Sequence, residues 1–172
     1  MKKKTKNTDE NLNAGNQVIA SLTRISEAIT SDLYLDDILR LIVNVTAEAM
    51  KSKICSLMLI DKSKNELAVK ATQSVSDRYN KKPNVKLGEG IAGRVAKEGI
   101  PITISDVRKD ERYLSRDIAK KENLCSLLSV PLIFKNKTIG ALNAYTAEPH
   151  VFTKNEINIL KSIANQLSLI HI

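Results

Sequence analysis

The sequence predicts an α+β domain in which two hairpins build an antiparallel sheet and amphipathic helices lie at both ends of the chain. Apolar residues recur every three or four positions before residue 50 and after residue 153, which is typical of helices with one buried face. Between these segments, two pairs of short apolar runs are each joined by a polar turn, which predicts the hairpins. A long loop with a Gly-rich stretch separates the two hairpins.

The size and composition indicate one globular domain. The chain has 172 residues, of which 42% are hydrophobic and 27% are charged, a balance that is neither disordered nor membrane-like. Its apolar stretches fall short of the roughly 20 residues that a transmembrane helix needs. The lysine-rich start lacks the apolar segment of a signal peptide, so we expect a cytoplasmic protein with no membrane partner.

Charge and cysteine content favour neither nucleic-acid binding nor a metal centre. The net charge is +8, but the basic residues are scattered, and four of the 27 lie in the first six positions. The chain has no Trp and only 3% aromatic residues, so it offers no stacking surface for a single strand. Cys55 and Cys125 are far apart, which predicts two buried thiols, with a redox role as the alternative.

The N-terminal region divides into a tail and a helix. Residues 1–13 are polar, so ordering them would bury too little surface to offset the loss of chain entropy. We therefore expect a disordered basic and polar tail at 1–13 and one domain over residues 14–172. A first helix follows, with its buried face at Val18, Leu22, Ile25 and Ile29.

Two further helices have start signals. The second begins near Ser31 and Asp32, because either side chain can accept hydrogen bonds from the free amides of a first turn. The last begins at Thr153, which forms a capping box with Glu156. Its apolar face comprises Ile157, Leu160, Ile163, Ala164, Leu167 and Ile170. This pattern still runs where the chain ends, so we expect the helix to continue into a missing or separate effector.

Two hairpins supply the centre of the sheet. The first is expected from Ile54–Asp61 and from Glu66 to about Ser74, on either side of the polar turn Lys62–Asn65. The second is expected from the apolar run Leu124–Phe134 and from Thr138–Thr146.

The segment between the hairpins is where a binding site is expected. Residues 75–86 are polar and without a period, which indicates a surface loop. Gly88–Ala96 predicts a turn into a short helix that ends at Gly99, and the strand Ile102–Ile104 follows. Asp106–Glu122 has apolar residues at helical spacing, which predicts another helix.

Three stretches together resemble GAF domains of bacterial signalling proteins, over about residues 20–170. They are Leu87–Val95 followed by Gly99-Ile100-Pro101 and Asp106, then Ser126–Leu132, and finally Ile139–Leu142 leading to Phe152-Thr153. The resemblance implies a GAF/PAS-like antiparallel sheet of about six strands. It also implies terminal helices on one face and, on the other, a lid of loops and short helices over a pocket. Members of this family sense cyclic nucleotides, tetrapyrroles, metals, amino acids or partner domains, and the sequence identifies neither ligand nor cofactor.

The pocket that the resemblance implies gives a set of candidate ligand-binding residues. Asp106 follows a strand, where it can cap the next turn or point into the pocket. Tyr113 can roof a ligand or simply pack, and the amide of Asn143 needs a partner in its strand. The full set is Leu57, Leu59, Ile91, Arg94, Val95, Ile104, Asp106, Tyr113, Ser126, Leu128 and Asn143.

The Gly-x-Gly-x-x-Gly spelling of Gly88, Gly90 and Gly93 has three interpretations. The simplest is a tight turn that needs positive φ or close backbone approach. Free amides at the start of the following helix could instead hold an anionic ligand, with Arg94 or Lys86 nearby. A dinucleotide fingerprint would require a βαβ unit, which the flanking loop and hairpin do not predict.

Catalysis is not expected from this sequence. The two histidines, His150 and His171, stand in no constellation with a nucleophile or a carboxylate pair. One enzymatic group of the family, the free methionine sulfoxide reductases, uses clustered cysteines, and Cys125 lies near the position of one of them. No cysteine occurs from Ser74 to Asp117, so this activity is a minor alternative.

The expected function is sensory or regulatory. A small molecule would bind under the lid, and a homodimer through residues 16–30 and 153–171 would relay the signal to an effector such as a histidine kinase or transcription activator. The alternative is a ligand-free structural dimerisation module. A large cavity under the lid would favour sensing, and a filled core there would favour the structural module.

Overall fold

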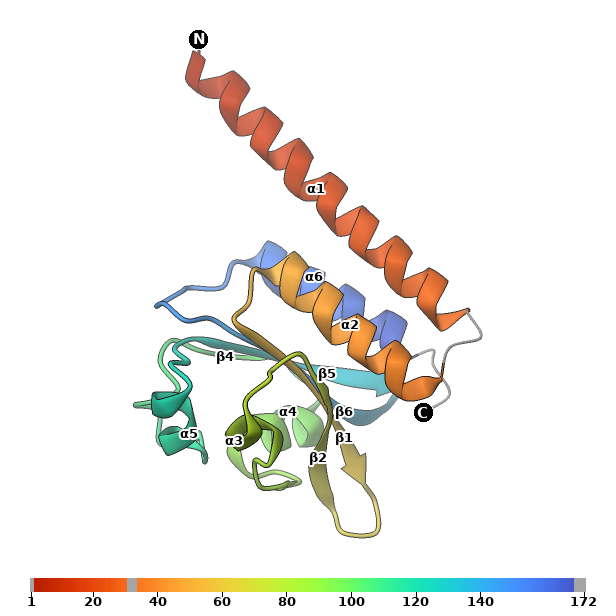
Figure 1. Ribbon diagram of the computed structural model, residues 1–172, viewed down its shortest axis with the longest axis vertical. Helices are drawn as coiled ribbons and strands as arrows, with labels where there is room; N and C mark the ends of the chain where they lie inside the picture. The colour runs from red at the N-terminus through yellow and green to blue at the C-terminus, as the bar shows by residue number, and fades with distance from the viewer. Residues whose placement is uncertain (1, 31–33, 169–172) are drawn as a thin grey trace.

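The centre of the molecule is a six-stranded antiparallel sheet in the order β3-β2-β1-β6-β5-β4 (Figure 1). The computed structural model describes residues 2–30 and 34–168. The strands are β1 Ile54–Asp61, β2 Glu66–Thr72, β3 Val85–Lys86, β4 Ile102–Ile104, β5 Leu127–Phe134 and β6 Lys137–Tyr145. The α+β class and the six antiparallel strands expected from the sequence are confirmed.

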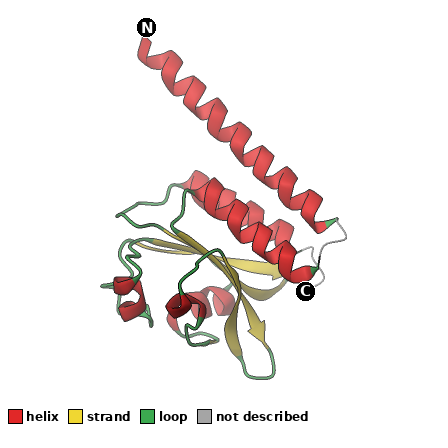
Figure 2. Ribbon diagram, viewed as in Figure 1, coloured by secondary structure: helices red, strands yellow, loops and turns green. Residues whose placement is uncertain are grey.

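Helices cover both faces of this sheet, with the long ones on one side and the short ones on the other (Figure 2). The first layer comprises α2 Leu35–Met50 and α6 Lys154–Leu167, and α1 Lys2–Ile29 packs on its outer side (Figure 1). The second layer comprises α3 Asp77–Asn80, α4 Gly90–Glu98 and α5 Arg116–Lys121. We call α3, α4, α5 and the loops of residues 75–124 the lid, and the sheet surface beneath them the lid face.

The two predicted hairpins lie side by side because β1 pairs with β6. Their register places three polar residues of the central strands in one row: Ser56 lies opposite Asn143, and Asn143 lies opposite Ser129. Residues opposite each other in neighbouring strands point to the same face of a sheet. This row therefore marks one face, and it is the lid face.

The other face of the sheet is closed by α2 and α6. Leu57, Leu128 and Leu142 project from the strands into this layer and are completely buried. They meet the apolar side of α6, where Leu160 and Leu167 are also completely buried. The apolar stripe of the last helix thus forms part of the domain's own core, instead of the dimer seam that its pattern suggested.

Helix caps agree with the sequence in two places. The capping box of Thr153 and Glu156 opens α6, and Gly99 ends α4 with a φ of +70°. The helix α2 starts at Leu35, after Tyr34. The predicted caps Ser31 and Asp32 lie outside the described residues, as do the last residues of the 153–171 helix face.

The first helix corrects one expectation. Residues 1–13 were expected to form a disordered tail, but α1 already begins at Lys2. Lys, Asn, Thr and Glu are compatible with a helix, and no proline interrupts the segment, so the turns continue from the amphipathic part. The C-terminal half of α1 packs on the domain through Ile25 and Ala28, whereas its N-terminal half extends away from it (Figure 1).

The lid differs from the prediction in two segments. It has less helix than expected over residues 106–122, and it has a short helix in the expected loop 75–86. Of the expected helix Asp106–Glu122, only α5 from Arg116 to Lys121 is helical, and Tyr113 lies in the preceding turns. The loop 75–86 holds the short helix α3, for which the Ser76 side chain accepts a hydrogen bond from the amide of Tyr79. Both differences bring tyrosines over the sheet.

Candidate functional site

The floor of the site is the polar row on the lid face. Ser129 Oγ donates to Asn143 Oδ1 at 2.6 Å, and Asn143 Nδ2 lies 3.4 Å from Ser56 Oγ. All three side chains are buried. Buried polar groups in an apolar sheet are costly unless they find hydrogen-bond partners, so this row holds its members in fixed orientations.

Three tyrosines stand over this floor and form what we call the tyrosine cluster: Tyr79 from α3, Tyr113 from the turns before α5, and Tyr145 from the end of β6. The Tyr145 ring contacts the other two edge to face, with centroid distances of 6.0 Å to Tyr79 and 6.2 Å to Tyr113. Tyr79 also donates a 2.9 Å hydrogen bond to Ser56, which joins the cluster to the floor.

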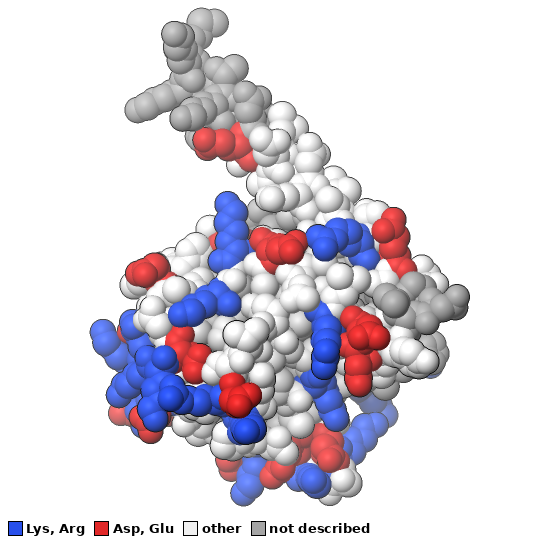
Figure 3. Space-filling model, in the orientation of Figure 1, with Lys and Arg blue, Asp and Glu red and all other residues white. Residues whose placement is uncertain are grey.

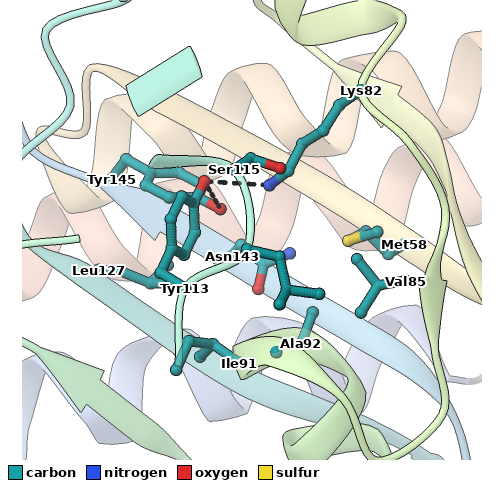
Figure 4. A pocket seen from close by; sticks show the side chains of 12 residues that line it. Met58, Lys82, Val85, Ile91, Ala92, Tyr113, Ser115, Leu127, Asn143 and Tyr145 are labelled. Atoms are coloured by element: carbon teal, nitrogen blue, oxygen red, sulfur yellow. Dashed lines mark hydrogen bonds between the residues drawn. The ribbon is translucent and has the colours of Figure 1, made fainter. Parts of the chain in front are cut away.

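The ammonium of Lys82 reaches into the tyrosine cluster from the loop between α3 and β3 (Figure 4). Its Nζ donates a 3.0 Å hydrogen bond to the hydroxyl of Tyr113, and that hydroxyl donates a 3.2 Å bond to Tyr145. Nζ also lies 4.8 to 5.9 Å from the centroids of all three rings. These are cation–π distances, so the electronegative ring faces stabilise the charge.

A small cavity remains between these groups and the start of α4. Its volume is about 20 Å³, which is room for one water molecule. Its lining comprises Met58, Lys82, Val85, Gly90, Ile91, Ala92, Tyr113, Leu114, Ser115, Leu127, Asn143 and Tyr145. The cavity is therefore too small for a metabolite in this state, and the Lys82 side chain is one of the groups that close around it (Figure 4).

Burial acts on two phenols of the tyrosine cluster. Burial raises the pKa of Tyr79 and the pKa of Tyr145 well above the usual value for a phenol. Both phenols therefore stay neutral at physiological pH and act as hydrogen-bond donors or acceptors, not as bases. Among the side chains that the structure describes, no group of three His, Cys, Asp or Glu residues could hold a metal ion.

Two consecutive Asp-x-Arg turns precede Tyr113 in the chain and position its side chain at the cavity. Asp106 accepts hydrogen bonds from Nε and Nη2 of Arg108 at 2.8 and 2.9 Å, and Asp110 binds Arg112 in the same way. The amide of Tyr113 then donates to the carbonyl of Asp110. The hydrogen bonds from Arg108 lower the pKa of Asp106 to about 2. These paired charges give the lid loop its defined path.

Three of the predicted site residues line the cavity: Ile91, Tyr113 and Asn143. Val95 and Ile104 pack in the same apolar cluster but behind the cavity wall. All five lie on the lid side of the sheet.

Leu57, Leu59 and Leu128 were expected in the pocket but lie on the opposite face, against α2 and α6. The strands that carry them are buried on both faces, so their apolar runs do not reveal which residues point to the lid. In each strand, the neighbouring residue is the one that points to the lid: Met58 beside Leu57 and Leu59, and Leu127 beside Leu128.

Arg94, Asp106 and Ser126 do not line the cavity. Arg94 is exposed on the outer side of α4. Asp106 accepts hydrogen bonds from Arg108 and is not free to bind a ligand in the cavity. Ser126 is buried, where it donates to the carbonyl of Ser105 at 2.7 Å and accepts from the amide of His150. Asp106 and Ser126 thus organise the lid and its connections.

The glycines of the Gly-rich stretch are needed for close backbone packing and for tight turns. A Cβ on Gly93 would lie 2.3 Å from the carbonyl oxygen of Lys86, so glycine lets α4 approach β3. The dinucleotide interpretation is wrong, because β3 and β4 lie at opposite edges of an antiparallel sheet and form no βαβ unit. Gly90 through Ala92, the first turn of α4, do line the cavity, and no side chain caps that turn.

The two thiols are both free and buried, as predicted. Cys55 faces the α2 and α6 layer, where burial raises its pKa far above that of a reactive thiol. Cys125 lies before β5, with its Sγ 3.3 Å from Nη2 of Arg108. Neither thiol lines the cavity, so the arrangement gives no cysteine pair beside a bound ligand.

The lid carries an excess of positive charge. Figure 3 shows Lys and Arg side chains gathered at the lower left, over the region where α3 and α5 lie in Figure 1. Residues 75–124 contain twelve basic and eight acidic residues, which is a net charge of +4 of the total of +8. The lid as a whole therefore carries a net positive charge.

Among the described residues, no helix is both long and apolar enough to cross a bilayer. This holds for α1 as well, whose 28 residues are largely polar.

Comparison with known proteins places the chain among signalling domains. It is 27% identical, over 153 residues, to the methyl sulfide methyltransferase-associated sensor of Methanosarcina acetivorans, with 86% of this chain and 15% of the sensor covered. The Nif-specific regulatory protein of Herbaspirillum seropedicae is 24% identical over 155 residues, with 87% of this chain and 28% of the regulator covered. The chain thus spans less than a third of these relatives.

Solved structures give the same fold. The GAF domain of a phosphoenolpyruvate-protein phosphotransferase from Coxiella burnetii has a TM-score of 0.81 at 27% identity, with 92% of this chain and 94% of that chain covered. The free methionine-R-sulfoxide reductase of Neisseria meningitidis has a TM-score of 0.74 at 20% identity, covering 88% and 86%, which is a likeness of fold alone.

The GAF domain family model matches residues 33–170, which is most of the chain. Relatives named as a sensor and as a regulatory protein support a sensory or regulatory role. The sequence, the fold and the relatives agree, and the chain belongs to the GAF domain family.

Proposed function

We propose that this GAF domain is a sensory module that binds a small molecule at the cavity beneath its lid. The observation that carries the proposal is the polar row of Ser56, Asn143 and Ser129, which continues through Tyr79 into the tyrosine cluster. If the lid face were only packed against the lid, apolar side chains would fill it equally well. Oriented hydroxyl and amide groups beside a cavity are instead what the binding of a polar ligand requires.

The relatives support the sensory part of this proposal. Two of them are named as a sensor and as a regulatory protein, and in both the matched region is a small part of a longer chain. We infer that this domain likewise regulates an effector, such as a histidine kinase or a transcription activator, in the cytoplasm. We also infer that it has no catalytic activity of its own, because neither thiol lines the cavity.

The size of the cavity favours a second candidate, a structural module that binds no ligand. A volume of about 20 Å³ admits a water molecule but no metabolite, so the lid must move for any ligand to enter. The half-buried Lys82 side chain is one of the groups that line this cavity, and it can withdraw by bond rotations. The small volume favours the structural module, and we prefer the sensory function because of the oriented polar row beside the cavity.

The output surface that we propose is the projecting half of α1. Leu12 and Ile19 are exposed there by 60% and 64%, and they lie seven positions apart, on one side of the helix. A second copy of the chain could bury this stripe as in a coiled coil. The outward face of α6 is polar at Asn158 and Lys161, so in this form of the homodimer α1 supplies most of the contact.

A thermal-shift screen of the full chain against neutral, cationic and anionic metabolites tests ligand binding, because a ligand raises the melting temperature as its concentration exceeds the Kd. Ala92→Met places a larger side chain at the cavity and should abolish the shift, whereas Ala20→Met, on the exposed side of α1, should not. If no compound shifts the wild type, or if Ala92→Met responds equally, the structural module is the better description.

A further inference from the structure

We propose that the ligand of this cavity is a small organic anion, and that Lys82 is both its counter-ion and the plug that fills the cavity in its absence. The proposal rests on the proposed function, because it names the chemistry of the ligand that the lid-face cavity takes.

The charge inside the cavity is one-sided. Of the twelve described residues that line it, Lys82 alone is charged, and none is a carboxylate. The first turn of α4 also faces the cavity, and helix N-termini carry partial positive charge and free amides. An anion would therefore meet a cation, a helix N-terminus and phenol hydroxyls, whereas a cation would be repelled by Lys82, which already uses the ring faces and the Tyr113 hydroxyl.

Among the described residues, the ammonium of Lys82 has no carboxylate partner, in contrast to the half-buried carboxylates Asp106 and Asp110, which are each paired with the arginine two residues on. No carboxylate among the described side chains lies within ion-pair distance of Lys82. A lysine ammonium has three N–H donors, and the bond to Tyr113 uses one of them. The remaining positive charge is available to a ligand.

The walls favour an anion with a short apolar body. Met58, Ile91 and Leu127 line the cavity opposite Lys82 and offer no hydrogen bonds from their side chains (Figure 4). Asn143 stands at the floor as a polar group for the distal end of the ligand. A carboxylate on a short aliphatic chain fits both features, whereas inorganic phosphate satisfies the charge but not the walls.

The place of Lys82 in the chain allows it to act as a plug. It lies between α3 and β3, next to the exposed Lys81 and Pro83, and its side chain is itself only half-buried. Rotation about its side-chain bonds would withdraw the ammonium from the three rings without moving the sheet. An arriving carboxylate would then take the ammonium as its partner while the four methylenes leave the cavity.

The test is calorimetric titration of the full chain with sodium butyrate, sodium glutamate, sodium phosphate and choline chloride at one ionic strength. The variants are Lys82→Met, which keeps the length and removes the charge, and Lys82→Arg, which keeps the charge. Lys81→Met is the matched control, because Lys81 is the exposed neighbour on the same loop. Lys82→Gln provides a second neutral variant, and circular dichroism checks that each protein is folded.

We expect a carboxylate to bind the wild type, Lys81→Met and Lys82→Arg with similar affinity, and Lys82→Met and Lys82→Gln at least about tenfold more weakly. Binding of phosphate but neither carboxylate would overturn the assignment of an organic anion. If choline or a neutral metabolite from the screen binds the wild type and Lys82→Met equally, the sensory function stands and this inference fails. If nothing binds the wild type in either experiment, both fail.

Discussion

The ammonium of Lys82 donates a 3.0 Å hydrogen bond to the hydroxyl of Tyr113, although 31 positions separate the two residues in the sequence. This bond joins the loop after α3 to the turns before α5, across the mouth of the cavity (Figure 4). Two parts of the lid are thus held together by a contact that a ligand would have to replace. The lid is closed because the hydrogen-bonding groups of its own side chains bind to one another.

Removing the hydroxyl of Tyr113 tests how much this contact stabilises the closed lid. Tyr113→Phe deletes the bonds to Lys82 and Tyr145 and should lower the free energy of unfolding by about 1 kcal/mol, the usual net value of a buried hydrogen bond. Urea denaturation measures the change. Tyr34→Phe, at a position that is 84% exposed, should have no effect, and an equal loss in both variants would refute the assigned role.

Gly140 tests the packing of the central strands beneath the site. A Cβ there would lie 2.1 Å from the carbonyl oxygen of Met58, so Gly140→Ala must push β6 away from β1. We expect a loss of about 3 kcal/mol or more in the free energy of unfolding, measured by urea denaturation. Gly15→Ala meets no atom within 4 Å and should cause no loss. A fully stable Gly140→Ala protein would show that the register of these strands is wrong.

The pH dependence of stability should report Asp106. Its pKa falls from 3.8 in the free side chain to about 2 in the folded protein, because Arg108 donates hydrogen bonds to it. A lowered folded pKa gives stabilisation that is complete above about pH 4 and is lost as the pH falls toward about 2.

The variant Asp106→Asn removes this contribution. Because Asp106 is 18% exposed and water screens the pair, we expect a loss of about 1 kcal/mol at pH 7 and a flatter acid limb. Thermal unfolding between pH 2 and pH 7 measures both. Asp77→Asn, at a side chain that is 86% exposed, is the control. An unchanged acid limb in Asp106→Asn would contradict the assignment.

Substitution of the exposed apolar stripe of α1 tests the proposed dimer. Leu12→Lys with Ile19→Lys should convert a dimer to a folded monomer, since neither side chain belongs to the core. Light scattering gives the mass, and the melting temperature confirms the fold. The pair Lys161→Glu and Asn158→Lys on the polar side of α6 should leave the mass unchanged. A dimer that persists in the α1 variant would exclude this surface.

The sequence predicted most of the elements because their signals are local. The bounds of β1 agree with the expected Ile54–Asp61, and the capping box at Thr153 begins α6. Each depends on neighbours within a few positions, such as a polar turn or a residue three places on. The helix expected over Asp106–Glu122 was wrong at its start, because Asp-x-Arg hydrogen bonds there favour turns over helix.

The site was only partly predictable because it depends on which way buried strands face. Leu57 and Leu59 were chosen in place of Met58, and a run that is apolar on both faces gives no sign of its orientation. The polar residues Ser56, Ser129 and Asn143 could have revealed the lid face, once their strands were aligned. Lys82 could not be found, since nothing local distinguishes it from the other exposed lysines of the chain.

The central claim is that a small molecule binds between the polar row and the lid, and side-chain NMR tests it most directly. The compound that raises the melting temperature is titrated into the ¹⁵N,¹³C-labelled full chain. We predict that the side-chain amide of Asn143 and the ring signals of Tyr113 and Tyr145 shift together, with one Kd, while the ring of the exposed Tyr34 does not. Unchanged signals from Asn143 and both cavity tyrosines at saturation would contradict the claim.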